Sequence, residues 1–497
     1  MRASGILMPV FSLPSRYGIG SFSKSAYQFV DMLKKAGQKY WQILPLCPTS
    51  YGDSPYQSFS TYAGNPYFID LDQLIEEKLL TRKECQACDF GDDPQDIDYG
   101  KLYENRMPLL KLAYERSLEK PDPKFTAFWT ENAWWLDDYA LFMAVKDRFD
   151  GVAWNEWAED IRLRWSNAMD YYRRELYYEI EFYSYLQFVF MKQWKKLKNY
   201  ANINGIEIIG DIPIYVAFDS ADAWANPELF QFDAENLPTA VAGCPPDGFS
   251  ADGQLWGNPL YRWDYHRETG FDWWIRRIAY CSELYDVVRI DHFRGFDEYY
   301  SIPYGDTTAR NGHWEKGPGI ALFEAAKNRL GELNIIAEDL GYITDSVKKL
   351  VADSGFPGMK VLEFAFDSRE KSDYLPYTYE KNSVVYTGTH DNETIAGWYA
   401  GLDKSDLKMC TDYMNIDRIP GKEYHWDFIR LAMLSVSDLC VIPIQDYLGL
   451  DNRARINHPS TLGTNWRWRL AKGKLSASLL KEIREMTRIS GRLQNGE

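Results

Sequence analysis

The chain has 497 residues, which is enough to bury a large core and too many for one minimal domain. Its 56 Lys and Arg residues against 72 Asp and Glu residues give a net charge of −16, which disfavours nucleic acid and anionic membranes as partners. No apolar run approaches the roughly 20 residues of a membrane span, and we expect no signal peptide. The seven cysteines are scattered, which indicates a reduced, cytoplasmic protein. No protein partner is evident from the sequence.

Strand-forming apolar runs recur along the chain, and helix-like patterns separate several of them. The predicted strands are Lys39–Leu46, Pro66–Leu71, Ile206–Pro213, Asp286–Asp291, Asn334–Glu338, Met359–Phe366, Ser383–Thr389 and Cys440–Gln445. The predicted helices between them include Ser23–Ala36, Glu181–Ala201, Trp273–Leu284, Ile320–Leu330 and Asp345–Asp353. Strands that alternate with helices in this way predict an α/β fold, a (β/α)8 TIM barrel that forms a single catalytic domain over residues 1–497.

Two connections are too long for simple crossovers. Residues 72–204 carry helical patterns, including Trp134–Arg148 and Arg162–Glu179, and we interpret them as a helical insertion between the second and third strands. Residues 216–269 are rich in Gly, Pro, Trp and Asp, and we expect a loop-rich insertion that covers the cleft. About fifty residues follow the eighth predicted strand, too few for a C-terminal β-sandwich.

Carboxylates stand where four of the predicted strands end. Asp211, Asp291 and Asp391 end the third, fourth and seventh strands, and Glu338 with Asp339 ends the fifth. In a barrel of this type the carboxyl ends of the strands line the active site. Arg289 lies two residues before Asp291 and projects to the same face, where its guanidinium would favour the ionised carboxylate.

Acids on neighbouring strands can do glycosidase chemistry. Paired strands lie about 4.8 Å apart, and retaining glycosidases hold two carboxyl groups about 5–5.5 Å apart. Asp291 would then attack the anomeric carbon, and an acid on the fifth strand would act as general acid and base. The pattern does not decide whether this general acid and base is Glu338 or Asp339, whose side chains point to opposite faces. Asp391 and His390 would hold sugar hydroxyls.

The alternative use of such acids is binding a hard cation. The cluster is also supplied with arginine and aromatic residues, which a cation site does not need, so we expect no metal. Cys85 and Cys88 form a C-x-x-C without a second ligand pair, and a zinc site there is not expected. Aromatic residues make up 16% of the chain and many lie in loops, where they suit the apolar faces of sugars, although a large aromatic core accounts for some of them.

Several longer motifs resemble glycoside hydrolase family 77, the 4-α-glucanotransferases also called amylomaltases or disproportionating enzymes. The resemblance runs from end to end, and two blocks are specific to this family: YGDSPYQSFS (residues 51–60) and PPDGFSADGQLWGNP (residues 245–259). Shorter motifs, shared with the broader α-amylase clan, are RIDHFRGF, IIAEDLG and TGTHDNET. The sequence differs from the family pattern at Asp451, Arg453 and Ser460, which we expect to alter one rim of the cleft.

The resemblance implies a role for each matching residue. Asp291 matches the nucleophile, Glu338 the general acid and base, and Asp391 the carboxylate that stabilises the transition state. The residues that match sugar-binding positions next to the scissile bond are Asp211, Arg289, His292 and His390. Ser54 and Tyr56 match the donor side, Trp256 matches the acceptor side, and Tyr51 and Tyr99 match a second glucan site found in some members, although packing is an equally good interpretation of these two tyrosines.

The resulting hypothesis is an enzyme without a cofactor that cuts α-1,4-glucans and maltooligosaccharides and passes the fragment to another sugar's 4-hydroxyl. One alternative is an α-amylase-like hydrolase, in which water is the acceptor. A second alternative, from a different class, is a noncatalytic glucan-binding protein on the same barrel. Incubation with maltotriose alone separates the three, because a transferase yields longer and shorter oligomers, a hydrolase only shorter sugars, and a binding protein neither.

Overall fold

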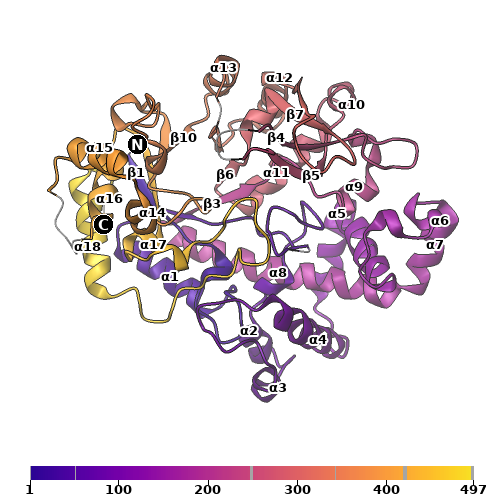
Figure 1. Ribbon diagram of the computed structural model, residues 1–497. Coiled ribbons are helices and arrows are strands. Elements are labelled where there is room, and N and C mark those ends of the chain that lie inside the picture. The colour runs from indigo at the N-terminus through magenta and orange to yellow at the C-terminus, as the bar shows by residue number, and fades with distance from the viewer. Residues whose placement is uncertain (1, 51, 247–249, 342, 418–422, 494–497) are drawn as a thin grey trace.

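The computed structural model describes residues 2–50, 52–246, 250–341, 343–417 and 423–493. Eight parallel strands close into a barrel in the order β1-β12-β11-β10-β9-β6-β3-β2, which confirms the predicted (β/α)8 fold. Figure 1 labels β1, β3, β6 and β10 among these strands. The barrel strands are β1 (Ala3–Leu7), β2 (Tyr40–Gln42), β3 (Glu207–Ile212), β6 (Val287–Ile290), β9 (Ile335–Ala337), β10 (Gly358–Val361), β11 (Ser383–Tyr386) and β12 (Leu439–Pro443).

The first two strands differ from the prediction. The predicted strand Pro66–Leu71 is wrong: Asn65 caps a 3-10 turn over Pro66–Phe68 by accepting a hydrogen bond from the backbone N–H of Tyr67. Asn before Pro is a helix-start signal, and its side chain outweighs the apolar character of the run. The true first strand is β1, whose Ala-Ser-Gly sequence is too poor in β-branched residues to stand out. Gly5 of β1 is needed there, because a Cβ would lie 2.7 Å from the Cβ of Tyr40 on β2.

Four of the predicted helices are found within one residue of their expected bounds: α1 (Lys24–Lys35), α11 (Asp272–Leu284), α12 (Ile320–Leu330) and α13 (Asp345–Ser354). The fifth, predicted over Glu181–Ala201, is longer and spans Tyr177–Ile203 as α8. The other helices outside the segment between β2 and β3 are α9 (Ala221–Ala225), α10 (Trp263–Glu268), α14 (Ile395–Gly401), α15 (Lys404–Met414), α16 (His425–Leu434), α17 (Ile444–Tyr447) and α18 (Ala477–Ile489).

Seven α-helices lie between β2 and β3 in the described part of this segment. They are α2 (Leu71–Glu76), α3 (Arg82–Ala87), α4 (Tyr99–Ser117), α5 (Pro123–Arg148), α6 (Glu159–Arg162), α7 (Ser166–Glu175) and α8 (Tyr177–Ile203). The predicted continuous helix Arg162–Glu179 is wrong, because Arg164 takes a left-handed conformation (φ 58°) that ends α6 before α7 begins. Figure 1 shows α6 and α7 on the side of the molecule opposite to α15 and α18.

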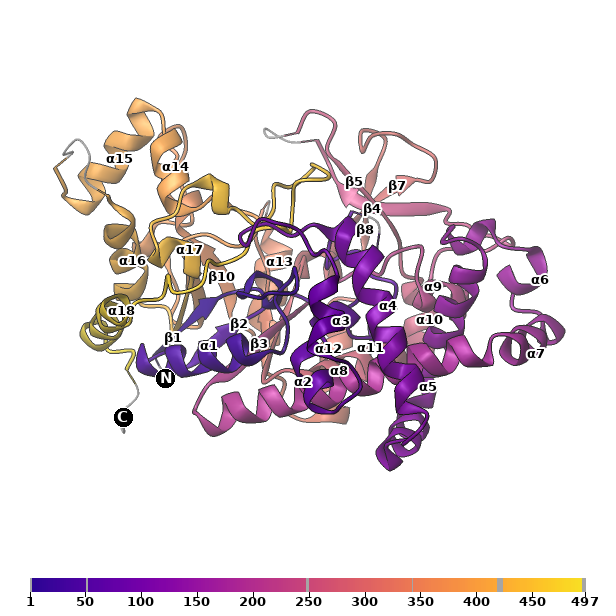
Figure 2. The same cartoon turned by 90° about the horizontal axis from the view of Figure 1, so that it is seen from below.

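A second sheet stands beside the barrel, and two of its strands lie in residues 216–269, where loops were expected. It has the antiparallel order β5-β4-β7-β8 (Figure 2). Its strands are β4 (Ala240–Cys244), β5 (Gln254–Pro259), β7 (Glu298–Pro303) and β8 (His313–Lys316). The sheet therefore joins the segment before β6 to the segment after it. Its strands hold several Gly, Pro and charged residues, so the sequence lacks the apolar alternation that would have predicted them.

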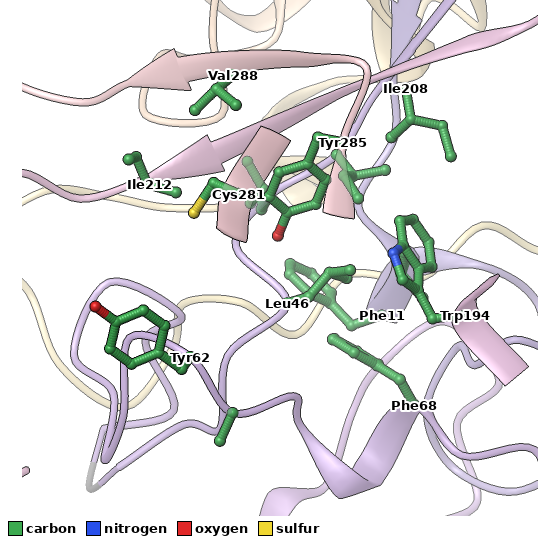
Figure 3. Packing of buried hydrophobic residues seen from close by; sticks show 14 of the residues in the cluster. Phe11, Leu46, Tyr62, Phe68, Trp194, Ile208, Ile212, Cys281, Tyr285 and Val288 are labelled. Atoms are coloured by element: carbon green, nitrogen blue, oxygen red, sulfur yellow. The ribbon is translucent and has the colours of Figure 1, made fainter. Parts of the chain in front are cut away.

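The barrel core is aromatic where α8 covers it. The Trp194 ring of α8 lies 5.2 Å from the Phe22 ring and 6.3 Å from the Tyr285 ring, centroid to centroid. Its indole N–H donates to the carbonyl of Leu284. Figure 3 shows Trp194 and Tyr285 in this core. Tyr285 lies against Gly210, where a Cβ would clash with its ring. Among the described helices, none is both long and apolar enough to cross a membrane.

Candidate active site

The first half of the site is built by the register of β3 and β6. Asp211 and Arg289 are directly paired across these strands. The Nη1 atom of Arg289 lies 2.8 Å and 2.6 Å from the two carboxylate oxygens of Asp211, and 3.2 Å from Oδ1 of Asp291. Both Asp211 and Arg289 are almost fully buried. A buried guanidinium that contacts two carboxylates keeps negative charge at this end of the barrel.

Glu338 and Asp339, which follow β9, point to different neighbours. Glu338 Oε2 accepts a hydrogen bond from the backbone N–H of His292 at 2.6 Å, and its Oε1 accepts one from Leu340 at 3.0 Å. Asp339 Oδ1 instead accepts from the backbone N–H of Met359 on β10 at 2.7 Å. Glu338 therefore faces the loop of Asp291, and Asp339 ties two strands together.

His292 has a left-handed backbone (φ 51°), which is uncommon outside glycine. The conformation turns its N–H toward Glu338 directly after the strand that carries Asp291. Strained residues of this kind concentrate at functional sites. Burial lowers the pKa of the His292 imidazole to about 3, so the ring is neutral near pH 7.

The two carboxyl groups share a low-dielectric environment. Burial raises the pKa of Asp291 well above its usual range; the Arg289 guanidinium opposes this rise, and the charge of Glu338 adds to it. Burial likewise raises the pKa of Glu338 to about 6, against the effect of Arg289 and of two backbone N–H donors. Close carboxylates resist joint ionisation, so protonation of the pair is linked.

His390 and Asp391 follow β11 on the other side of the site. The buried His390 ring stacks on Tyr56, with centroids 5.2 Å apart and planes 8° from parallel. The Tyr56 hydroxyl donates to Asp211 Oδ2 at 2.7 Å, so Tyr56 connects the two halves of the site. The His390 Nε2 atom lies 3.4 Å from Asp391 Oδ1, and the Asp391 side chain is 41% exposed. Burial lowers the pKa of His390, with the Asp391 charge acting in the opposite direction.

The predicted donor and acceptor residues lie at the edges of this cluster. Ser54 accepts a hydrogen bond from the backbone N–H of Tyr56 and so shapes the turn that presents this tyrosine. Trp256, on β5, meets the His292 ring edge to face, with centroids 4.8 Å apart. Gln57 donates to Asn258 at 3.0 Å, which links the Tyr56 loop to β5.

The expected second glucan site involves two tyrosines, Tyr51 and Tyr99. Tyr51 lies outside the described residues. Tyr99 begins α4, and its hydroxyl donates to the carbonyl of Trp466 at 2.8 Å. Trp466 in turn packs against the rings of Tyr56 and His390, at 5.7 and 5.9 Å. Tyr99 thus contacts a residue that supports the site and is not itself in the cluster of carboxylates.

The sequence reasoning missed residues in the coil after β12. Asn457 and Arg455 hydrogen-bond to Asp391, and Trp466 packs against His390. No periodicity marks this coil, and only the tryptophan was a signal that could have drawn attention to it. Asp451 and Arg453, which differ from the family pattern, pair with each other at the surface at 2.9 Å. In the described part of the chain, no three His, Cys, Asp or Glu side chains are grouped to hold a metal ion.

Buried carboxyl groups at the carboxyl ends of neighbouring barrel strands, with aromatic faces beside them, define the class of barrel enzymes that act on carbohydrate. A family model described as 4-alpha-glucanotransferase matches residues 8–475, and the chain belongs to this family. It is 49% identical to a 4-alpha-glucanotransferase of Clostridium butyricum, over 98% of this chain and 100% of that protein. It is 46% identical to one of Thermus thermophilus, over 99% of both chains.

Solved structures give the same picture. The structure superposes on the amylomaltase of Streptococcus agalactiae in complex with acarbose with a TM-score of 0.97, at 44% identity, covering 99% of this chain and 100% of that one. The amylomaltase of Corynebacterium glutamicum is only 20% identical and shares the fold with a TM-score of 0.77, over 99% of this chain and 75% of that chain.

Proposed function

We propose that Asp291 is the nucleophile, Glu338 the general acid and base, and Asp391 the carboxylate that stabilises the transition state in a retaining transfer. The reaction moves a segment of an α-1,4-glucan to the 4-hydroxyl of an acceptor glucose or maltooligosaccharide. The observation that carries the proposal is the Arg289 contact to Asp291 beside a Glu338 whose pKa burial raises to about 6. Two acids with different environments are what an acid and a nucleophile need.

In the first step the Asp291 carboxylate attacks the anomeric carbon, the glycosidic C–O bond breaks, and Glu338 gives its proton to the leaving oxygen. Burial raises the pKa of both acids, but Arg289 hydrogen-bonds to Asp291 and not to Glu338 among the described contacts, so we assign the negative charge to Asp291 and the proton to Glu338. In the second step Glu338 takes the proton of the acceptor 4-hydroxyl, whose oxygen attacks the same carbon and displaces Asp291. Two displacements retain the anomeric configuration.

The other residues of the cluster bind sugar in this proposal. Asp211, Arg289, His292 and His390 surround the ring next to the scissile bond. The neutral His292 and His390 rings can each donate one hydrogen bond and accept another, as sugar hydroxyls require. Ser54 and Tyr56 lie on the donor side.

We assign the acceptor side to the segment at 216–269, which carries β4 and β5 together with its loops and which we expect to cover the cleft, while residues 72–204 form the helical insertion. Trp256 offers an aromatic face for the incoming ring, and its contact with His292 supports this place for it. An acceptor held there gains effective concentration over water, which favours transfer over hydrolysis. A cytoplasmic location belongs to the same proposal and is supported by the seven cysteines, none of which forms a disulfide within the described residues.

Incubation of the purified protein with maltotriose alone tests the function. We expect a ladder of longer and shorter oligomers with glucose, and an Asp291→Asn variant as the matched inactive control. Only shorter sugars would indicate a hydrolase, and unchanged maltotriose that is nevertheless bound would indicate a noncatalytic binding protein.

A further inference from the structure

The segment that carries His390 and Asp391 is held by a stretch of chain far from it in the sequence. We call residues 446–457 the clasp; they run from the end of α17 through a 3-10 turn at Asn452–Ala454 to the coil at Asn457. Asp446 accepts hydrogen bonds from the Thr387 hydroxyl at 2.5 Å and from the backbone N–H of Ile395 at 2.8 Å. Asn452 accepts from the backbone N–H of Thr394 at 3.2 Å. These contacts fix the two ends of the segment and do not touch Asp391.

The end of the clasp reaches the middle of the segment. The side-chain amide of Asn457 donates to Asp391 Oδ1 at 2.6 Å, and the Asn457 backbone N–H donates to the His390 carbonyl at 3.1 Å. Arg455 donates to the Asp391 carbonyl at 2.7 Å and to the Asn457 carbonyl at 2.7 Å. Backbone and side chain of the same acid are therefore held from one short stretch of coil.

The hydrogen bond from Asn457 makes the two carboxylate oxygens of Asp391 different from each other. Oδ1 accepts from the Asn457 amide and lies 3.4 Å from the His390 ring nitrogen. No hydrogen bond joins Oδ2 to any residue in the described ranges, so Oδ2 is left for a sugar hydroxyl. A hydrogen bond to a charged group is about twice as strong as one between neutral groups. The single bond from the Asn457 amide can therefore favour one rotamer of the Asp391 side chain.

We propose that Asn457 is a positioning residue, which orients the Asp391 carboxylate so that Oδ2 faces the sugar. The proposal rests on the proposed role of Asp391. Asp391 lies beyond the end of β11 and its side chain is 41% exposed, so neither the strand nor close packing restricts its rotation. Misplacement of a catalytic group by about 1 Å can cost roughly 100-fold in rate.

The test compares two asparagines of the clasp. Asn457→Ala and the isosteric Asn457→Asp both remove the donor, and the second preserves shape and the backbone bond to His390. For both we expect kcat on maltotriose to fall roughly 10- to 100-fold, with KM within about threefold, because the contact acts in the transition state. Asn452→Ala is the matched control: it loosens the same segment without touching Asp391, and we expect its kcat within about threefold of wild type.

A double-mutant cycle shows whether Asn457 acts through Asp391. In an Asp391→Asn background the carboxylate is gone, so adding Asn457→Ala should change the remaining rate by less than about threefold. If the losses multiply instead, or if Asn452→Ala loses as much kcat as Asn457→Ala, Asn457 only braces the coil and the proposal is wrong. Wild-type kcat in Asn457→Ala beside an inactive Asp391→Asn would also overturn it while leaving the proposed function intact. Near wild-type transfer by Asp391→Asn itself would instead remove the role assigned to Asp391.

Discussion

The two halves of the active site are supported in different ways. On one half, Asp211, Arg289, Asp291 and Glu338 stand on or directly after β3, β6 and β9, and they are held by one another and by adjacent backbone. We call this the strand-borne half. On the other half, His390 and Asp391 lie in the coil beyond β11 and depend on the clasp. We call this the clasped half.

The comparison teaches where preorganisation comes from in this barrel. Strand register brings the charged groups of the strand-borne half together as soon as β3, β6 and β9 pair, because Asp211 and Arg289 are register partners. The clasped half needs two segments outside the barrel strands to meet, and the Asp391 side chain at their contact is 41% exposed. We therefore expect the largest losses from the strand-borne half and graded losses from the clasped one.

The largest effect is expected from Asp291→Asn. The amide keeps the shape but cannot attack the anomeric carbon, so transfer should fall by roughly 10⁴-fold or more while binding of maltooligosaccharides and the unfolding temperature change little. Transfer from maltotriose and calorimetric binding measure the two. A loss smaller than that of Asp391→Asn would reverse the ranking of the two halves.

Glu338→Gln should cost roughly 10²- to 10⁴-fold on glucans. With a glycosyl fluoride, whose leaving group needs little protonation, the variant should accumulate a covalent adduct on Asp291, visible by intact-mass and peptide mass spectrometry. Asp339→Asn, the neighbouring acid that binds the Met359 backbone, is the matched control and should accumulate none. Label on Asp339 or Asp391 would contradict the assignment.

The same residue sets a pH dependence. Glu338 must be protonated to cleave, and burial raises its pKa to about 6, so kcat/KM on glucans should fall as the pH rises through about 6. When the Glu338→Gln variant is assayed with a glycosyl fluoride, kcat/KM should no longer fall as the pH rises through about 6, because the titrating group has been removed. An unchanged fall in kcat/KM would mean that another group titrates there.

A moderate effect is expected from Trp256→Ala, at the edge of the strand-borne half. If the indole stacks the acceptor, the ratio of reducing ends released to glucosyl units transferred should rise several-fold on maltotriose. Leu255→Ala is the control, because Leu255 is exposed on the same strand and points to the opposite face. An unchanged ratio with both activities lowered would mean that Trp256 only packs against His292.

The smallest effect concerns stability beside the clasped half, where the Glu363 backbone N–H donates to the Thr387 carbonyl at 3.2 Å. Glu363 follows β10, is buried, and its Oε1 has no hydrogen-bond partner among the described residues. Burial raises its pKa well above the usual range, and Asp446 and Glu393 add to the rise while Arg455 opposes it. The folded state thus keeps a proton that the unfolded chain loses above about pH 4.5, so stability falls as the pH rises through this range.

Glu363→Gln removes this titration. Near pH 7 the variant should be more stable than wild type by about 1 kcal/mol or more, since the buried group no longer has to ionise or hold a proton. The difference should vanish below about pH 4, where both states of the wild type are protonated. Urea unfolding at several pH values measures it, with the exposed Glu370→Gln as the control. A difference independent of pH would contradict the argument.

The strand-borne half could be predicted from the sequence, because an apolar run that ends in an acid marks the carboxyl end of a strand. The pattern could not decide between Glu338 and Asp339, since the chain leaves the strand at Ala337 and alternation no longer applies. β1 was missed because its residues are small, and Pro66–Leu71 was mistaken for a strand because a capping asparagine was overlooked. Asn457 could not be found, because a contact between two coils depends on the whole tertiary structure.

The position of Asn457 near the end of the chain also bears on protein synthesis. Translation proceeds from the N-terminus, so Asp291 and Glu338 leave the ribosome well before β12, which begins at Leu439 and closes the barrel against β1. Asn457 emerges after that strand. The chain therefore carries both reactive acids without a finished site while the residues from 339 to 457 are being added, and nascent or prematurely terminated products are not expected to degrade the glucans around them.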